Sequence, residues 1–391
     1  MNNKVVIVGA KRTPIGSFQG WFSTVPCNEL GAIAIHAAVQ HAGVRPDAVD
    51  DVLMGCVLPA GVGQAPARMA SLKAGIPSSA GAVTINKVCG SGMKTIQIAH
   101  DQIIAGSAEI VVAGGMENMS LAPYLLPKAR GGYRMGDAEV LDHIFTDGLQ
   151  DPHDKLMMGV YGERCAEKFN FTRAAQDAFA ITSIERALHA MGGEFKDEIT
   201  PVTVQSRRGD SVVSEDQEPP ACKPDKIPTL RAAFKKDGTV TAASSSKISD
   251  GAAATVLMSA QKAADMDLAP LATIVSHASF SQQPEWFTTA PIGAIKRVLD
   301  KAGWAVDDVD LYEVNEAFAV VTMAVMQELS IDHAKMNVNG GACALGHPIG
   351  ASGTRIVVTL INALQHRGLK KGVAALCIGG GEATAVAIEL P

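Results

Sequence analysis

Two of the seven cysteines in this 391-residue chain lie in settings where a thiol could react. Cys89 lies in KVCGSGMKT, immediately before a predicted amphipathic helix. The positive end of a helix dipole and its free backbone N–H groups would stabilise a thiolate and lower the pKa of the thiol. Gly90 and Gly92 permit a strained turn and close approach of a substrate. Cys89 is therefore a candidate nucleophile, although a structural cysteine explains an isolated C-G-S-G motif equally well.

Cys377 lies in ALCIGGGEA, at the end of a predicted buried strand. Reactive groups in α/β sheets gather at the carboxyl ends of strands. The glycines that follow leave backbone N–H groups free, and these could hold an oxyanion. The usual interpretation of a strand cysteine is a buried, inert residue. Cys377 is a candidate because of its place in a repeat of the chain.

His347 and Asn315 are polar residues in unusual settings. His347 lies in the glycine-rich segment GGACALGHPIGASG, where Pro348 fixes the backbone and the imidazole lies above a turn. Taken alone, His347 is better interpreted as a surface loop histidine. In VNEAFA, Asn315 and Glu316 follow an apolar run and precede a helix. Asn315 could cap that helix, hold a water or face a substrate carbonyl.

The elements that would position these residues occur twice. Residues 84–118 are predicted to form a strand, a cysteine turn, a helix and a buried strand that ends in glycines, and residues 337–390 repeat that order. VDDVLMG and VDDVDLYEV form a second matching pair. Apolar β-branched runs beside amphipathic helices indicate α/β units with a strongly buried sheet. A duplicated α/β domain is the simplest account, and a chance match of two short helices is the alternative.

Residues 121–246 have a different character. Two stretches, LAPYLLPKARGGYRMGD and DSVVSEDQEPPACKPDKIPTL, are rich in proline, glycine and charge. A helix is predicted over 172–191, with Thr172 as its N-cap. Long insertions of this kind are usually lids or binding elements. The predicted helix argues against the alternative, a disordered linker.

Charge and composition exclude several classes of function. A net charge of −6 gives no general attraction to nucleic acid or to anionic membranes, so a ligand with phosphates would need a local basic patch. The odd, dispersed cysteines without a C-x-x-C pair argue against a disulfide framework and a structural zinc site. No His/Asp/Glu cluster has metal-ligand spacing along the sequence, and neither G-x-G-x-x-G nor a P-loop is present. The N-terminus lacks the pattern of a signal or transit peptide, and no apolar run is long enough to span a bilayer, so cytoplasm is the expected location.

Five motifs in order resemble the signatures of one family, the thiolases: VCGSGMK, GGMENMS, NEAFA, NGGACALGHPIGASG and CIGGGEA. GAKRTPIGSF and SDGAAA add to the match, which runs from the first predicted strand to the last. The resemblance implies an α/β, five-layered αβαβα thiolase fold made of two similar halves with an inserted loop domain. Residues 1–120 plus 247–268 would form the N-terminal half, 121–246 the loop domain over the coenzyme A (CoA) site, and 269–391 the C-terminal half.

The resemblance also implies roles for the candidate residues. Cys89 would attack a 3-ketoacyl-CoA or acetyl-CoA and become acetylated, and His347 would activate it. With a water held by Asn315, His347 would stabilise an enolate oxygen, while Cys377 would move the proton at the α-carbon or on the CoA sulfur. Backbone N–H groups of Cys89 and Gly379 would form a second oxyanion hole. The family needs no metal or prosthetic group, uses CoA as substrate and product, and typically forms tetramers built from tight dimers.

Departures from the family pattern concern the ligand. Met157-Met158-Gly159 stands where short-chain enzymes have His-Met-Gly, so Met157 replaces a histidine that contacts the acyl-CoA. The CoA-binding arginine falls in a proline-rich stretch, and we expect Lys223 and Lys226 to supply charge to the CoA phosphates. The remaining expected CoA contacts are Ser246, Met158, Ala317 and Phe318.

The acyl chain is the least constrained part of the prediction. Phe287 falls where short-chain enzymes often carry methionine, and it could narrow an acyl tunnel or pack against the loop domain. The favoured function is an acyl-CoA C-acetyltransferase that interconverts two acetyl-CoA with acetoacetyl-CoA plus CoA. A broader-chain 3-ketoacyl-CoA thiolase of fatty-acid β-oxidation is the alternative.

Two other classes of protein are disfavoured. A non-catalytic acyl-CoA-binding protein is disfavoured because Cys89 and His347 are both present. A ketoacyl synthase is disfavoured because that branch pairs its cysteine with two histidines.

Overall fold

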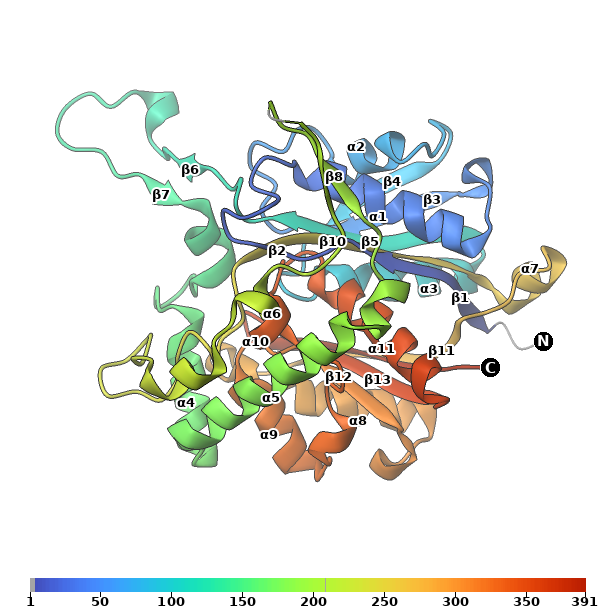
Figure 1. The fold of residues 1–391 in the computed structure, drawn as a ribbon. Helices are drawn as coiled ribbons and strands as arrows, with labels where there is room; N and C mark the ends of the chain where they lie inside the picture. Colours follow the sequence, from blue (N-terminus) through green and yellow to red (C-terminus); the bar gives the residue numbers. More distant parts are fainter. Residues whose placement is uncertain (1–3, 208) are drawn as a thin grey trace.

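The computed structural model describes residues 4–207 and 209–391, and within them ten strands form one twisted sheet with two halves (Figure 1). The N-terminal half consists of β4 (Gly81–Ile85), β3 (Asp51–Gly55), β5 (Ile110–Asn118), β10 (Ser249–Ser259), β1 (Val5–Arg12) and the short β2 (Gly16–Ser17) beside β10. The C-terminal half consists of β12 (Leu311–Val314), β13 (Lys371–Ile378), β14 (Glu382–Glu389) and β11 (Ala272–Ser281). The halves meet where β1 pairs with β11, from Val5 opposite Ile274 to Ile7 opposite Ala272.

Helices complete five layers. The outer helices of the N-terminal half are α1 (Cys27–Ala42) and α2 (Pro66–Lys73), and those of the C-terminal half are α8 (Ala290–Ala302) and α9 (Ala319–Leu329). Between the two halves lie α3 (Ser91–Ala105) and α11 (Ser352–Arg367), as Figure 1 shows. Every residue of α11 from Ser352 to Leu364 is buried, as expected of a helix surrounded on all sides. The predicted fold class is confirmed.

Strands β5, β10 and β13 are buried on both faces, so their neighbouring side chains belong to different layers of the core. In β13, Val373 and Ala375 face the outer helices of the C-terminal half, whereas Ala374 and Leu376 face α3 and α11. This alternation is the two-residue period of a strand. Cys377 continues the outward-facing set and is fully buried.

The predicted repeat corresponds to equivalent elements. VDDVLMG directly follows the short helical turn η1 (Pro46–Ala48), whereas VDDVDLYEV begins with the turn η7 (Val306–Asp308), and the two segments continue into β3 and β12. Strand β3 pairs in parallel with β5, and β12 pairs in parallel with β13. In both halves, the central helix follows a loop that carries a candidate catalytic residue.

The segment 121–246 contains helices and two small hairpins. Its elements are β6 (Tyr124–Leu125), η2 (Ala129–Gly131), β7 (Leu141–Asp142), η3 (Phe145–Leu149), α4 (Met158–Phe169), α5 (Arg173–Met191), η4 (Glu194–Asp197), β8 (Val202–Val204), β9 (Ser211–Val213), α6 (Glu218–Ala221) and η5 (Pro224–Thr229). The β6–β7 arm projects from the body (Figure 1). Thr172 caps α5 as predicted, because its side chain accepts a hydrogen bond of 3.1 Å from the Ala175 N–H.

Short elements complete the fold: α7 (Ala260–Asp265), η6 (Pro284–Thr289), η8 (His333–Lys335) and α10 (Ala342–Leu345). In the part of the chain that the structure describes, no helix is both long and apolar enough to cross a membrane.

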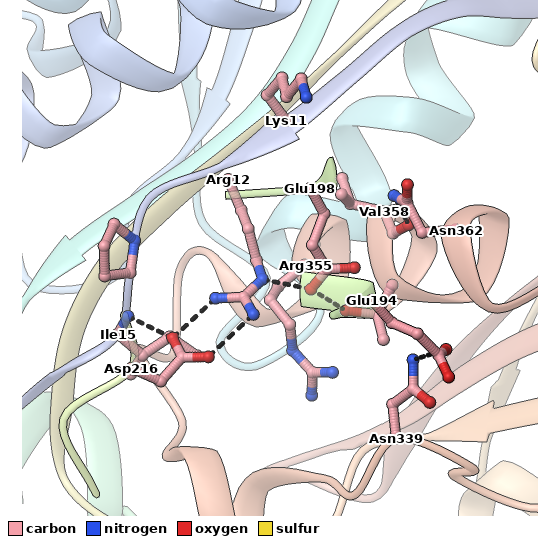
Figure 2. Close-up of polar contacts among 12 residues, drawn as sticks. Lys11, Arg12, Ile15, Glu194, Glu198, Asp216, Asn339, Arg355, Val358 and Asn362 are labelled. Atoms are coloured by element: carbon pink, nitrogen blue, oxygen red, sulfur yellow. Dashed lines mark hydrogen bonds and ion pairs between the residues drawn. The ribbon is translucent and has the colours of Figure 1, made fainter. Parts of the chain in front are cut away.

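A buried ion cluster fixes the inserted segment to both halves (Figure 2). The fully buried Arg12, at the end of β1, donates from Nε to Glu198 Oε1 at 2.5 Å. Its two terminal nitrogens donate to the carboxylate oxygens of Asp216 at 2.7 and 2.9 Å. Glu198 Oε1 also accepts from Thr359 Oγ1 of α11 at 3.1 Å, and Asp216 accepts from the Ile15 N–H at 2.8 Å. One arginine therefore joins the first strand, the insertion and the central helix.

We expect Arg12→Met to lower the free energy of unfolding by about 3–5 kcal/mol, because it leaves two buried carboxylates without their cation. Urea unfolding monitored by circular dichroism measures this change. Arg45→Met is the matched control, since Arg45 pairs with Asp47 on the surface and its side chain is 82% exposed. Equal midpoints for the two variants would contradict the assigned role of Arg12.

Candidate active site

Cys89 lies on a strained turn between β4 and α3. The residue before it, Val88, has a φ of +46°, which is unfavourable for a β-branched side chain. Two hydrogen bonds hold this conformation: the Val88 N–H donates to Asn86 Oδ1 at 2.9 Å, and Ser91 Oγ donates to the Val88 carbonyl at 2.6 Å. Gly90 has an ordinary φ of −81°. The strain expected at the glycines therefore lies at Val88.

Glycines are required where the first turns of α3 and α11 touch. A Cβ on Gly92 would lie 2.9 Å from the Thr354 backbone nitrogen, and a Cβ on Gly353 would lie 2.3 Å from that of Met93. Thr354 Oγ1 also donates to the Gly92 carbonyl at 2.8 Å. The helix that follows Cys89 and the helix that follows the His347 loop are thus in backbone contact.

His347 is 4% exposed and is held by hydrogen bonds on both ring nitrogens. Nδ1 lies 2.5 Å from Ser352 Oγ, and that hydroxyl lies 3.0 Å from the Pro348 carbonyl, to which it donates. Because the hydroxyl proton is used there, Ser352 Oγ accepts from an Nδ1–H. Nε2 then carries the lone pair and lies 3.5 Å from Asn315 Nδ2. Burial, with a smaller effect of the positive charge of Arg355, lowers the pKa of His347 to about 3.

Asn315 is fully buried at the end of β12. Its backbone N–H donates to the Ala375 carbonyl at 3.0 Å, which ties it to the neighbouring strand β13. Its side-chain Oδ1 has no hydrogen-bond partner among the described residues. A buried amide oxygen of this kind calls for a donor from water or from a ligand.

Both cysteines favour the neutral thiol. Burial raises the pKa of Cys89 to about 11, although the backbone N–H groups of Gly379 and of Cys89 itself act in the opposite direction. The expected lowering of this pKa is therefore wrong for the resting protein, because loss of hydration outweighs the favourable dipoles. Burial, and then the nearby Cys89, raise the pKa of Cys377 well above its ordinary value. The structure thus brings Cys89, Cys377 and the Gly379 N–H together.

A cavity of about 420 Å³ opens beside these groups. Its lining is mainly apolar and includes His347, and Cys89 packs against a cluster to which the lining residues Met119 and Ile349 belong. The other lining residues are Phe18, Phe145, Leu149, Met157, Met158, Gly159, Glu218, Ala233, Phe234, Ala242, Ser245, Ser246, Lys247, Ile248 and Phe318. A cavity of this size and polarity suits a small organic ligand.

Of the residues predicted to contact CoA, three line the cavity: Ser246, Met158 and Phe318. Ala317 lies directly behind, since its carbonyl accepts from the Ser246 N–H at 3.0 Å. In contrast, Lys223 and Lys226 are exposed and lie outside the lining.

The two residues considered for acyl chain length also differ in whether they line the cavity. Met157 lines the cavity. Phe287 does not, because it is 3% exposed and packs edge-on against Tyr161 of α4, with ring centroids 6.0 Å apart. Packing against the inserted segment was the second of the two interpretations of Phe287.

Sequence motifs did not single out Glu117, which organises the floor of the site. This fully buried carboxylate accepts from the N–H groups of Val57 and Gly350 at 2.9 Å and of Leu58 at 3.2 Å. Burial raises the pKa of Glu117 to about 7 despite these hydrogen bonds. Its position in GGMEN, at the carboxyl end of a buried strand, was the available signal. Ser352 and Lys247 were missed too.

A cysteine on a strained turn, a neutral histidine from the opposite half and an N–H donor facing the thiol are a combination of groups that can carry acyl transfer. The chain matches the thiolase N-terminal domain over residues 5–261 and the thiolase C-terminal domain over residues 268–390. The chain belongs to the thiolase family and is an acyltransferase.

Its relatives are similar along their whole length. The chain is 50% identical over 388 residues to an acetyl-CoA acetyltransferase of Cupriavidus necator, covering 98% of this chain and 99% of that protein. It is 48% identical over 392 residues to one of Schizosaccharomyces pombe, covering 100% and 99%. The structure of an acetyl-CoA acetyltransferase from Syntrophomonas wolfei, 41% identical, matches with a TM-score of 0.97 over 100% of both chains.

The buried His347 predicts a pH dependence of stability. Its pKa is about 3 in the folded protein, whereas an unfolded histidine has a pKa of about 6.5. Between these values the unfolded chain binds one more proton at this position, so the free energy of unfolding falls as the pH falls. From pH 6.5 to pH 5 this amounts to about 2 kcal/mol. We expect His347→Asn to lose this contribution.

Urea unfolding of the two proteins at pH 7 and at pH 5 measures the difference. Other titrating groups are common to both proteins, so the comparison isolates His347. An unchanged pH dependence in the variant would show that His347 is not held neutral.

Proposed function

We propose that the protein is an acyl-CoA C-acetyltransferase that interconverts two acetyl-CoA with acetoacetyl-CoA plus CoA through an acetyl-Cys89 intermediate. The observation that carries this proposal is the convergence of the Cys89 thiol, the Gly379 N–H and the neutral His347 beside one apolar cavity. The names of the relatives from C. necator and S. pombe support the same substrate.

Acyl transfer begins with the proton of Cys89. In the resting enzyme, a Cys89 thiolate beside a protonated His347 is unfavourable. The pKa of Cys89 is about 11 and that of His347 is about 3, and this difference of about eight units corresponds to a cost on the order of 10 kcal/mol. The proton therefore moves to His347 Nε2 as the sulfur attacks the carbonyl carbon, and not before. The N–H groups of Gly379 and Cys89 stabilise the oxyanion that forms. Collapse of this intermediate breaks the bond to CoA, whose sulfur leaves as a thiolate and takes the proton of Cys377, and an acetyl thioester remains on Cys89 while His347 stays protonated.

The second half-reaction needs an enolate and a base. Nε2 of a protonated His347 can donate to the enolate oxygen, together with a water on the unpartnered Oδ1 of Asn315. Cys377 is the base at the α-carbon. Its raised pKa makes the thiolate a stronger base, which suits a weakly acidic C–H. Thiolysis is the reverse sequence, and ping-pong kinetics follow because the first CoA leaves before the second acyl-CoA binds.

Coenzyme A would bind along the cavity, and the reaction would need no prosthetic group. Ser246, Met158, Ala317 and Phe318 would contact the pantetheine arm. Lys247 is the one cation in the cavity lining among the described residues, so it is better placed than Lys223 and Lys226. Those two exposed lysines would act only through long-range attraction of the phosphates.

A broader-chain 3-ketoacyl-CoA thiolase is the second candidate. The observation that favours it is the apolar lining, in which Met157 stands in place of a polar histidine and Phe287 does not narrow the space. Relative kcat/KM for 3-ketoacyl-CoAs of increasing length separates the two candidates. A steep fall beyond acetoacetyl-CoA supports the acetyltransferase.

We further propose that 1–120 plus 247–268, 121–246 and 269–391 act as two core halves and a covering loop domain. A cytoplasmic homotetramer, as a dimer of dimers, is the proposed assembly. The β6–β7 arm supports association, because it exposes Tyr124 (68%), Met135 (97%) and Val140 (55%). Light scattering would give the oligomeric state.

Thiolysis of acetoacetyl-CoA, followed by loss of the Mg²⁺-enolate absorbance, tests the function. We expect Cys89→Ala to abolish turnover. Cys377→Ala should release about one equivalent of CoA from acetyl-CoA in a burst and then turn over at least 100-fold more slowly than the wild type. A thiol reagent measures the released CoA.

The buried Cys27 provides the matched control, because it lies outside this cavity lining. Cys27→Ala should retain the normal burst and steady rate. Loss of the burst in Cys377→Ala, with the fold intact, would contradict the division of roles between the two cysteines.

A further inference from the structure

Three metal-ligating side chains meet away from the active site, near the C-terminal end of α3. His100 and Asp101 belong to α3, and His277 belongs to β11. Asp101 Oδ1 lies 3.1 Å from His100 Nδ1 and 3.0 Å from His277 Nε2. One ligand atom from each residue lies within 4.8 Å of the others, and the two imidazole rings meet edge to face.

Buried hydrogen bonds link α3 to the strands beneath these residues. Gln97, one turn earlier in α3, is 1% exposed and donates from Nε2 to the carbonyls of Ala278 at 3.1 Å and Ala385 at 3.4 Å. Ser276 faces α8, because its hydroxyl donates to the Val298 carbonyl at 2.7 Å. Since strand side chains alternate, His277 faces α3.

We propose that His100, Asp101 and His277 form a binding site for a divalent transition metal of the Zn²⁺ class. Imidazole nitrogens and a carboxylate oxygen are ligands that Zn²⁺, Co²⁺ and Ni²⁺ accept. Tetrahedral ligands about 2.0–2.1 Å from zinc lie about 3.3 Å apart, close to the two nitrogen–oxygen distances in this cluster. Small rotations of the two imidazole rings would bring His100 Nδ1 and His277 Nε2, which lie within 4.8 Å of each other, to the same separation.

The exposed fractions of the three side chains fit a metal site that is open to solvent on one side. The side chains of His100 and His277 are 19% and 18% exposed, and that of Asp101 is 60% exposed. Water can therefore complete the coordination. Lys301 lies nearby, with Nζ donating to the His277 carbonyl at 3.0 Å, and its charge opposes that of a bound cation.

A bound metal would connect the central helix of the N-terminal half to a strand of the C-terminal half. The metal would bind the folded protein, in which the three ligands converge, and would raise its thermal midpoint. In the metal-free alternative, the imidazole N–H groups of His100 and His277 both donate to Asp101 Oδ1. That arrangement satisfies the same three side chains and gives no response to metal.

Titration of the full-length protein with Co²⁺ and Zn²⁺ tests the site. We expect one equivalent of Co²⁺ to bind with the weak visible bands of nitrogen and oxygen ligands, and Zn²⁺ to raise the thermal midpoint by several degrees. Asp101→Asn and His277→Gln should each reduce Co²⁺ affinity at least tenfold and remove the Zn²⁺ shift. Asp101 is largely exposed, so its variant will fold even if His277→Gln does not.

The control is His366→Gln, which removes a histidine that pairs with a single carboxylate, Asp197, at 2.9 Å. This variant should retain full Co²⁺ binding and the Zn²⁺ shift. Three results would overturn the proposal: no bound Co²⁺, binding unchanged in Asp101→Asn, or an intense near-ultraviolet thiolate band that places the metal on cysteines.

Discussion

The close contact between the first turns of α3 and α11 is the constraint on which the site depends. Gly92 and Gly353 leave no room for a Cβ, so the two helix starts approach backbone to backbone. The loop before each helix carries one candidate catalytic residue, Cys89 in one half and His347 in the other. A duplicated fold thereby builds one asymmetric site, because its two copies contribute different side chains at equivalent places.

Desolvation sets the chemistry at this contact. It holds the His347 imidazole neutral, and it holds the Cys89 thiol neutral although nearby backbone N–H groups favour the thiolate. A reaction that creates a thiolate and an imidazolium only while an oxyanion forms beside fixed donors then has little solvent to reorganise. Glu117 supports the arrangement from below by fixing two loops through backbone N–H groups.

Much of this could be predicted from the sequence. The repeat predicted two halves, and VDDVLMG and VDDVDLYEV do contain equivalent strands, β3 and β12, each of which pairs in parallel with the next central strand of its half. Thr172 predicted a helix start because capping is a local interaction. Properties that arise from long-range packing could not be predicted. Burial reversed the expected pKa shift of Cys89, and spacing could not place His277 beside Asp101, 176 residues away in the sequence.

The most direct test of the central claim is the position of the acyl group on the enzyme. Brief incubation with acetyl-CoA, acid quenching and peptide mass spectrometry should find one acetyl group on the peptide that contains Cys89. The label should disappear when free CoA is added before quenching. An acetyl group on the Cys377 peptide, or none on the Cys89 peptide of an active enzyme, would contradict the account.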